Sequence, residues 1–169
     1  MALTEHPSIQ GVLTLELRDP GGALLERRRV DNLITNAGKE LLARLLGGKL
    51  NGAIQLVIGV GEGKLVDEKD AKKGRLAAAP GDRALGSKVS EAKAEMSEPV
   101  TDGNNRVTVN VKATIVDGGT ADVPLALTEA GILVRVGNDA VGVLFNHVVF
   151  PVINKGANMS LLLSWDLTF

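Results

Sequence analysis

Residues 107–115 read VTVNVKATI, and this stretch decides which class of fold the chain is expected to adopt. Apolar side chains at every second position alternate with Thr, Asn and Lys, which is the period of a β-strand with one buried and one solvated face. The phrase DGNN at 102–105, which precedes it with only Arg106 between, is typical of a tight turn. Residues 88–98 alternate in the same way before that turn. Their composition also suits a helix, but the turn favours a hairpin of two strands.

The N-terminal part of the chain repeats this pattern. In residues 11–18 three leucines alternate with polar residues, and DPGG at 19–22 is a turn in which Pro presets φ and Gly accepts a positive φ. Residues 23–30 then return, which predicts an N-terminal hairpin. Further strands are predicted at residues 53–60, 127–136, 141–150 and 160–169. The last of these strands is expected to bury one face formed by Leu161, Leu163, Trp165, Leu167 and Phe169.

One segment predicts a helix, at residues 36–46. Thr35 and Asn36 can cap its N-terminus, leucines follow at one-face spacing, and Gly47-Gly48 can end it. Several strands linked by turns, with one short helix near the N-terminus and an N-terminal hairpin, predict a mainly β fold, an antiparallel β-sandwich. We expect residues 1–169 to form a single structural domain, with residues 1–30 as a candidate N-terminal hairpin arm.

Composition excludes several classes of function. The chain has 169 residues, of which 44% are hydrophobic and only 2% aromatic, so the core must be mostly aliphatic. Cysteine is absent, which excludes disulfides, cysteine-bound zinc and a cysteine nucleophile. The formal net charge of −1 offers no global attraction to nucleic acid or to an anionic membrane. No apolar run approaches the roughly 20 residues that a membrane-spanning helix needs, and no secretory signal is visible at the start.

The glycine-rich phrase GVGEGK at 59–64 resembles a phosphate-binding loop only superficially. Its two outer glycines are one residue too close for a P-loop, and Leu65 stands where a hydroxyl would bind Mg²⁺. We interpret it as a glycine-rich bend at the end of a strand. Residues 64–81 follow as a long, lysine-rich and aperiodic loop, and loops of this length are usually functional or mobile.

The candidate functional residues are few. The two histidines, His6 and His147, could contribute to a metal site only if the N-terminus folded onto a late strand, so a packed or interface histidine is favoured. His147 shares the strand parity of Val143, Phe145 and Val149 and is expected on the same face as they are. Glu129 lies inside a predicted strand, where either a satisfied hydrogen bond at a tight packing point or a catalytic or calcium role is open.

The only basic triplet is Arg27-Arg28-Arg29, which fits phosphate binding or, preferably, a solvated or subunit-facing strand end. The candidate interface residues are therefore Arg27, Arg28, Arg29 and His147. No catalytic, cofactor-binding or metal-binding residue is predicted, and no cofactor is expected.

Six short phrases resemble, in the same order, those of phage tail-fibre and baseplate-associated structural proteins, which also occur in tail-like contractile injection particles. Residues 30–46, VDNLITNAGKELLARLL, resemble the phrase in which Asn-Leu-(Val/Ile)-Thr-Asn-x-Gly leads into a leucine helix. The others are VIGVG at 57–61, DRALG at 82–86, LTEAGIL at 127–133, FNHVVFP at 145–151 and LSWDLTF at 163–169. In two places the chain departs from the family. Asn146-His147 stands where an Arg is expected, and the 64–81 loop is long.

The resemblance implies a structural, non-enzymatic subunit of a bacteriophage tail or tail-like particle, in the fibre, baseplate or collar. Its partners would be other copies of itself, in a homo-oligomer for which the family favours a trimer, and neighbouring tail or particle proteins. Neither nucleic acid nor a membrane is expected as a partner. Its location would be the virion or tail-like particle, assembled in the host cytoplasm. The alternatives are a receptor- or glycan-binding module at a fibre tip and a tail-associated hydrolase.

Overall fold

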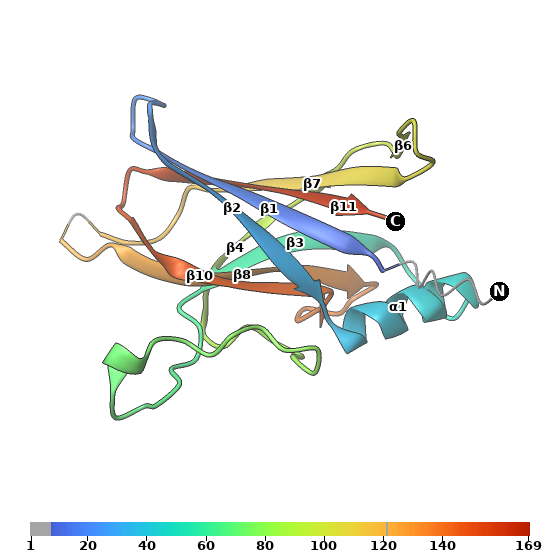
Figure 1. Cartoon of the computed structure of the whole chain (residues 1–169), viewed down its shortest axis with the longest axis horizontal. Coiled ribbons are helices and arrows are strands. Elements are labelled where there is room, and N and C mark those ends of the chain that lie inside the picture. The colour runs from blue at the N-terminus through green and yellow to red at the C-terminus, as the bar shows by residue number, and fades with distance from the viewer. Residues whose placement is uncertain (1–7, 121) are drawn as a thin grey trace.

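A computed structural model describes residues 8–120 and 122–169, and within them the chain is mainly β and antiparallel, with one short α-helix near an N-terminal hairpin (Figure 1). The helix is α1 (Asn36–Leu46), and a single 3₁₀ turn, η1, covers Ala71–Lys73. The strands are β1 (Gln10–Arg18), β2 (Leu24–Ile34), β3 (Ile54–Gly61), β4 (Lys88–Lys93), β5 (Glu95–Met96), β6 (Val100–Thr101), β7 (Val107–Ile115), β8 (Leu125–Val136), β9 (Val143–Leu144), β10 (Asn146–Lys155) and β11 (Ser160–Thr168).

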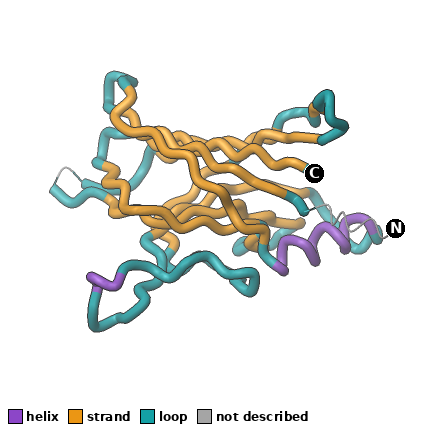
Figure 2. The backbone as a smooth tube through the Cα atoms, viewed as in Figure 1, coloured by secondary structure: helices purple, strands orange, loops and turns teal. Residues whose placement is uncertain are grey.

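The prediction of a β-sandwich is wrong, because the strands form one continuous sheet that curls until it nearly closes (Figure 2). Its strand order is β4-β3-β8-β10-β2-β1-β11-β7-β5, with β6 on β7 and β9 on β8. Two segments join what would otherwise be separate layers. Strand β2 pairs with β1 along most of its length and with β10 through Leu33 and Ile34. Residues 88–98, predicted as one strand, contain two strands. The first, β4, pairs with β3, and the second, β5, follows Ala94 and pairs with β7.

The predicted hairpin and helix are both confirmed. Strands β1 and β2 pair from Gly11 opposite Asn32 to Arg18 opposite Leu24, and β1 lies between β2 and β11. The first seven residues of the candidate arm lie outside the described residues. Helix α1 begins after Thr35, whose side chain accepts a hydrogen bond from the Gly38 amide.

The core fills the inner face of the curled sheet with aliphatic side chains around Trp165, which is fully buried. The predicted apolar face of the last strand is confirmed for Leu161, Leu163, Trp165 and Leu167. Phe169 follows the end of β11 and is 47% exposed. The described part of the chain has no helix long and apolar enough to cross a membrane.

A long loop, residues 62–87, covers the outer face of the sheet over β3 and β8, below the sheet in Figure 1. It contains the predicted 64–81 loop, in which η1 and a bridge between Leu65 and Arg75 are the only regular structure. Leu85 packs there on Val57, Leu133 and Leu144 in a second, smaller apolar cluster. This 62–87 loop places polar groups over a buried strand, and the candidate site follows from it.

Candidate functional site

Glycines allow the 62–87 loop to lie directly on the sheet. A Cβ atom at Gly61 would sit 2.3 Å from the Ser87 carbonyl oxygen and 2.6 Å from a Glu129 carboxylate oxygen. A Cβ at Gly86 would lie 2.5 Å from the Lys64 nitrogen. Real Cβ atoms do not approach other atoms this closely, so side chains at these positions would push the loop away. The phrase GVGEGK is thus the end of a strand, as predicted, and also the place where a second chain segment comes close.

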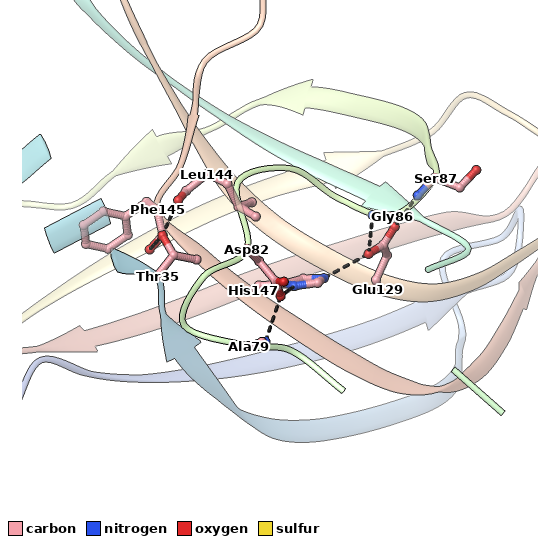
Figure 3. Close-up of polar contacts among 9 residues, drawn as sticks. All are labelled: Thr35, Ala79, Asp82, Gly86, Ser87, Glu129, Leu144, Phe145 and His147. Atoms are coloured by element: carbon pink, nitrogen blue, oxygen red, sulfur yellow. Dashed lines mark hydrogen bonds and ion pairs between the residues drawn. The ribbon is translucent and has the colours of Figure 1, made fainter. Parts of the chain in front are cut away.

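Glu129 lies beneath this close approach and is only 1% exposed. One carboxylate oxygen, Oε2, accepts a hydrogen bond from the Gly86 amide at 2.9 Å, and the other, Oε1, accepts one from Ser87 at 2.9 Å (Figure 3). Oε2 also lies 2.9 Å from Nε2 of His147. The satisfied hydrogen bond at a tight packing point, one of the two interpretations of Glu129, is what the structure shows.

His147 on β10 completes a chain of three titratable side chains. Its Nδ1 atom lies 2.7 Å from Oδ2 of Asp82, and that same oxygen accepts a hydrogen bond from the Ala79 amide at 2.7 Å (Figure 3). The histidine is buried, and it faces the 62–87 loop. Phe145, by contrast, belongs to the inner core. The expectation that His147 shares the face of Phe145 is therefore wrong, because the chain between β9 and β10 is irregular at Phe145. It holds for Val149, which lines the same outer depression as His147.

Burial and hydrogen bonding act against each other on the pKa values of this cluster. Burial alone would lower the pKa of His147, but the hydrogen bonds and negative charges of Glu129 and Asp82 raise it above its ordinary 6.5. Burial alone would raise the pKa of Glu129, but hydrogen bonds from His147, Ser87 and Gly86 lower it below 4.5. Both shifts favour the charged forms, an imidazolium beside a carboxylate.

The basic triplet lies elsewhere, on β2. Arg28 donates to the carbonyl oxygens of Pro151 and Val152 on β10 and pairs with Glu26. Arg27 is mostly exposed and lies 3.6 Å from Glu16. The structure therefore does not gather Arg27, Arg28, Arg29 and His147 into one site, and their role at an interface stays a prediction.

A second feature is an apolar hollow of about 710 Å³ at the end of the sheet beside α1. Its floor is formed by core residues such as Val111 and Ile132, and α1 lies along one side. Four large apolar side chains at its rim are about half exposed: Leu45, Ile54, Met96 and Phe169. Leu46, the last residue of α1, is 90% exposed and is not among the residues that line the hollow.

Comparison with known proteins adds no assignment, because no family model, curated protein or solved structure matches this chain. The resemblance to phage tail proteins is thus supported only by the phrases quoted above. Within the described residues no group of three or more His, Asp or Glu side chains is arranged to hold a metal ion.

Sequence reasoning singled out Glu129 and His147 separately but missed Asp82 and the apolar hollow. The phrase DRALG contains Asp82 and was noticed only for its resemblance. No periodic signal links residue 82 to residue 147, since the contact depends on how the 62–87 loop folds back. A signal for the hollow did exist. Three leucines of the predicted helix stripe, Leu41, Leu42 and Leu45, line the hollow.

Proposed function

We propose that the protein is a structural subunit of a bacteriophage tail or tail-like particle, in the fibre, baseplate or collar. It would act by self-assembly and by docking to neighbouring subunits. The observation that supports this is the apolar hollow beside α1 with its half-exposed rim. Exposed apolar side chains gathered around a concavity are typical of surfaces that bury against another protein.

The proposal commits to other copies of this chain as the first occupant of that surface. The hollow and its half-exposed rim side chains, such as Leu45 and Met96, form one surface, so the same surface carries both projecting side chains and a recess. A surface of this kind can be complementary to itself across a symmetry axis, which gives a closed oligomer. The trimer favoured by the family is one such assembly.

Sedimentation and light scattering of matched variants test this proposal. Leu45→Glu places a charge on a half-exposed side chain that lines the hollow, so folding is expected to tolerate it while assembly is lost. Val123→Glu is the control, because Val123 is 67% exposed and follows β7 at the opposite end of the sheet from the hollow. We expect a closed oligomer for the wild type and for Val123→Glu, and a monomer for Leu45→Glu. A wild type that is monomeric at high concentration would contradict self-assembly.

Electron microscopy of the native particle with this subunit labelled tests its location. Label on the fibre, baseplate or collar is expected. A soluble monomer that binds cells or a glycan array would instead favour the receptor-binding alternative. The hydrolase alternative requires a pair of carboxylates that face a pocket. Asp31 lines a depression beside His147, but Glu129 is buried and both its oxygens accept hydrogen bonds.

A further inference from the structure

The contacts of His147 fix how many protons its ring must carry. Both ring nitrogens lie within hydrogen-bond distance of a carboxylate oxygen, at 2.7 Å from Asp82 and 2.9 Å from Glu129. An ionised carboxylate only accepts hydrogen bonds, and a neutral imidazole has only one N–H to donate. Both contacts are therefore satisfied only when the ring is doubly protonated. A neutral ring must turn a lone pair towards one of the two carboxylates.

The surroundings decide which contact fails. Glu129 is 1% exposed and is fixed by two backbone amides, so it cannot move away or exchange His147 for water. Asp82 has a side chain that is 29% exposed and lies on the 62–87 loop, where water can replace the lost contact. The neutral ring thus keeps its single N–H on Glu129, and its lone pair repels Asp82.

We propose that Asp82 and His147 form a proton-dependent latch, which holds residues 79–82 on the sheet while the ring carries two protons and releases them when it loses one. The released segment is defined by its hydrogen bonds. Asp82 accepts from the Ala79 amide, the Asp82 amide donates to the Ala79 carbonyl, and the Pro80 carbonyl accepts from the Asn36 amide. Release therefore also frees the first amide of α1, while Gly86 and Ser87 stay bound to Glu129.

The remaining charged groups around His147 do not supply an alternative partner. The shallow depression beside the ring is lined by Asp31 of β2 and Arg75 of the loop. Asp31 is exposed, and the guanidinium of Arg75 donates to the Gly63 carbonyl. Among the described residues, Asp82 and Glu129 are the two groups that contact the ring nitrogens directly. The latch is independent of the proposed function, since it needs only these contacts within one chain.

Hydrogen exchange of the intact protein between pH 6 and 9.5, corrected for the intrinsic exchange rate at each pH, tests the latch. The Asn36 amide, whose hydrogen bond joins the segment to α1, should lose protection once the pH exceeds the pKa of His147 in the open form, where Glu129 still contacts the ring. The Ala79 and Asp82 amides, which bond within the segment, should lose protection with it. Between the pKa of the ring in the open form and its pKa in the closed form, protection should fall by up to tenfold per pH unit, because opening releases one proton in this interval. The amides of Gly86 and Ser87 should not follow this slope. NMR titration of the ring should give His147 a pKa above its ordinary 6.5.

Two variants separate direct contact from the general electrostatic field. In Asp82→Asn the amide can donate to the neutral ring, so protection of residues 79–82 should become nearly independent of pH. Asp31→Asn removes a nearby carboxylate that does not contact the ring, and it should keep the wild-type slope. The proposal is overturned by a flat wild-type profile. An Asp82→Asn profile with the wild-type slope, or joint opening of Gly86 and Ser87, would also overturn it.

Discussion

Two halves of the sheet are buried in different ways: the first is formed by β1, β7 and β11, and the second by β3, β8 and β10. In β1, β7 and β11 burial alternates along the strand, because one face packs on the core and the other meets solvent. In β8 every residue from 127 to 134 is buried, because the 62–87 loop covers the outer face that the first half leaves bare. Alternation of apolar and polar residues along a strand therefore indicates that its outer face meets solvent. A strand whose outer face is covered does not show this alternation.

The two halves also differ in what holds them. The first half depends on apolar side chains such as Leu13 and Trp165, which are fully buried. The second half also has an apolar inner face, and on its outer face Glu129 and His147 make additional polar contacts. We expect the stability of the first half to depend most on buried side-chain volume, and that of the second to depend also on buried charge.

The largest effect expected is from Trp165→Ala, in the first half. The indole is fully buried, and its Nε1 atom has no hydrogen-bond partner among the described residues, so its contribution is packing. Loss of a buried Trp typically costs about 3–5 kcal/mol, against a total domain stability of about 5–15 kcal/mol. Deletion of residues 167–169 should act in the same direction by unpairing the end of β11. Urea unfolding, or failure to obtain soluble protein, measures both.

Two substitutions show whether this is a packing effect. Trp165→Phe keeps most of the volume and should cost much less than Trp165→Ala. Phe169→Ala should also cost less, because Phe169 is 47% exposed. A soluble, correctly assembled deletion variant would show that the end of β11 is dispensable.

A medium effect is expected from Glu129→Gln, in the second half. The change keeps the shape but removes a charge that two amides and an imidazolium contact. Breaking such buried hydrogen bonds costs about 1–3 kcal/mol. Glu40→Gln is the control, because Glu40 pairs with Arg44 on the exposed side of α1, where a pair contributes less than about 1 kcal/mol. Equal losses in urea unfolding would remove the distinction between the two halves.

The fold was predictable from sequence where a strand has one wet face, and less so elsewhere. The alternation of residues 107–115 and the capping residues of α1 gave the right elements at nearly the right bounds. The continuity of the sheet was not visible, because it depends on β2 and on the 88–96 segment each pairing with different strands along their lengths. Buried polar side chains carry no periodic signal either. Lys155 is fully buried, and its ammonium donates to the Val116 and Gly118 carbonyls, which follow the end of β7.

A smaller, pH-dependent effect should distinguish the second half from the first. His147 has a raised pKa, so its contribution to stability is complete below 6.5 and is lost as the pH rises through its folded value. Glu129 has a lowered pKa, so its contribution is complete above 4.5 and is lost as the pH falls through its folded value. The cluster therefore stabilises the fold most between pH 4.5 and 6.5.

Unfolding free energies measured across this range should fall on the alkaline side by about 1.4 kcal/mol for each unit by which the pKa of His147 is raised. In His147→Gln the unfolding free energy should no longer fall on the alkaline side. Trp165→Ala should lower the unfolding free energy at every pH and keep the wild-type pH dependence. A wild type whose stability rises between pH 6.5 and 8 would contradict the sign of the histidine shift.

The smallest effect on stability is expected from cutting the 62–87 loop itself. Trypsin should cut first within residues 64–75, at exposed lysines such as Lys69 and Lys72, because this part of the loop is held mainly by hydrogen bonds within itself, among them the exposed Lys73–Asp67 pair and the Leu65–Arg75 bridge. Both ends of the loop are anchored in the sheet, since Gly61 pairs with Lys88 and the amides of Gly86 and Ser87 bind Glu129. The two fragments should therefore stay together in size-exclusion chromatography and separate only in denaturant. Prompt cleavage at Arg27–Arg29 with the loop intact would show instead that the loop is the better-protected region, and fragments that separate after the first cut would show that Glu129 does not hold the loop.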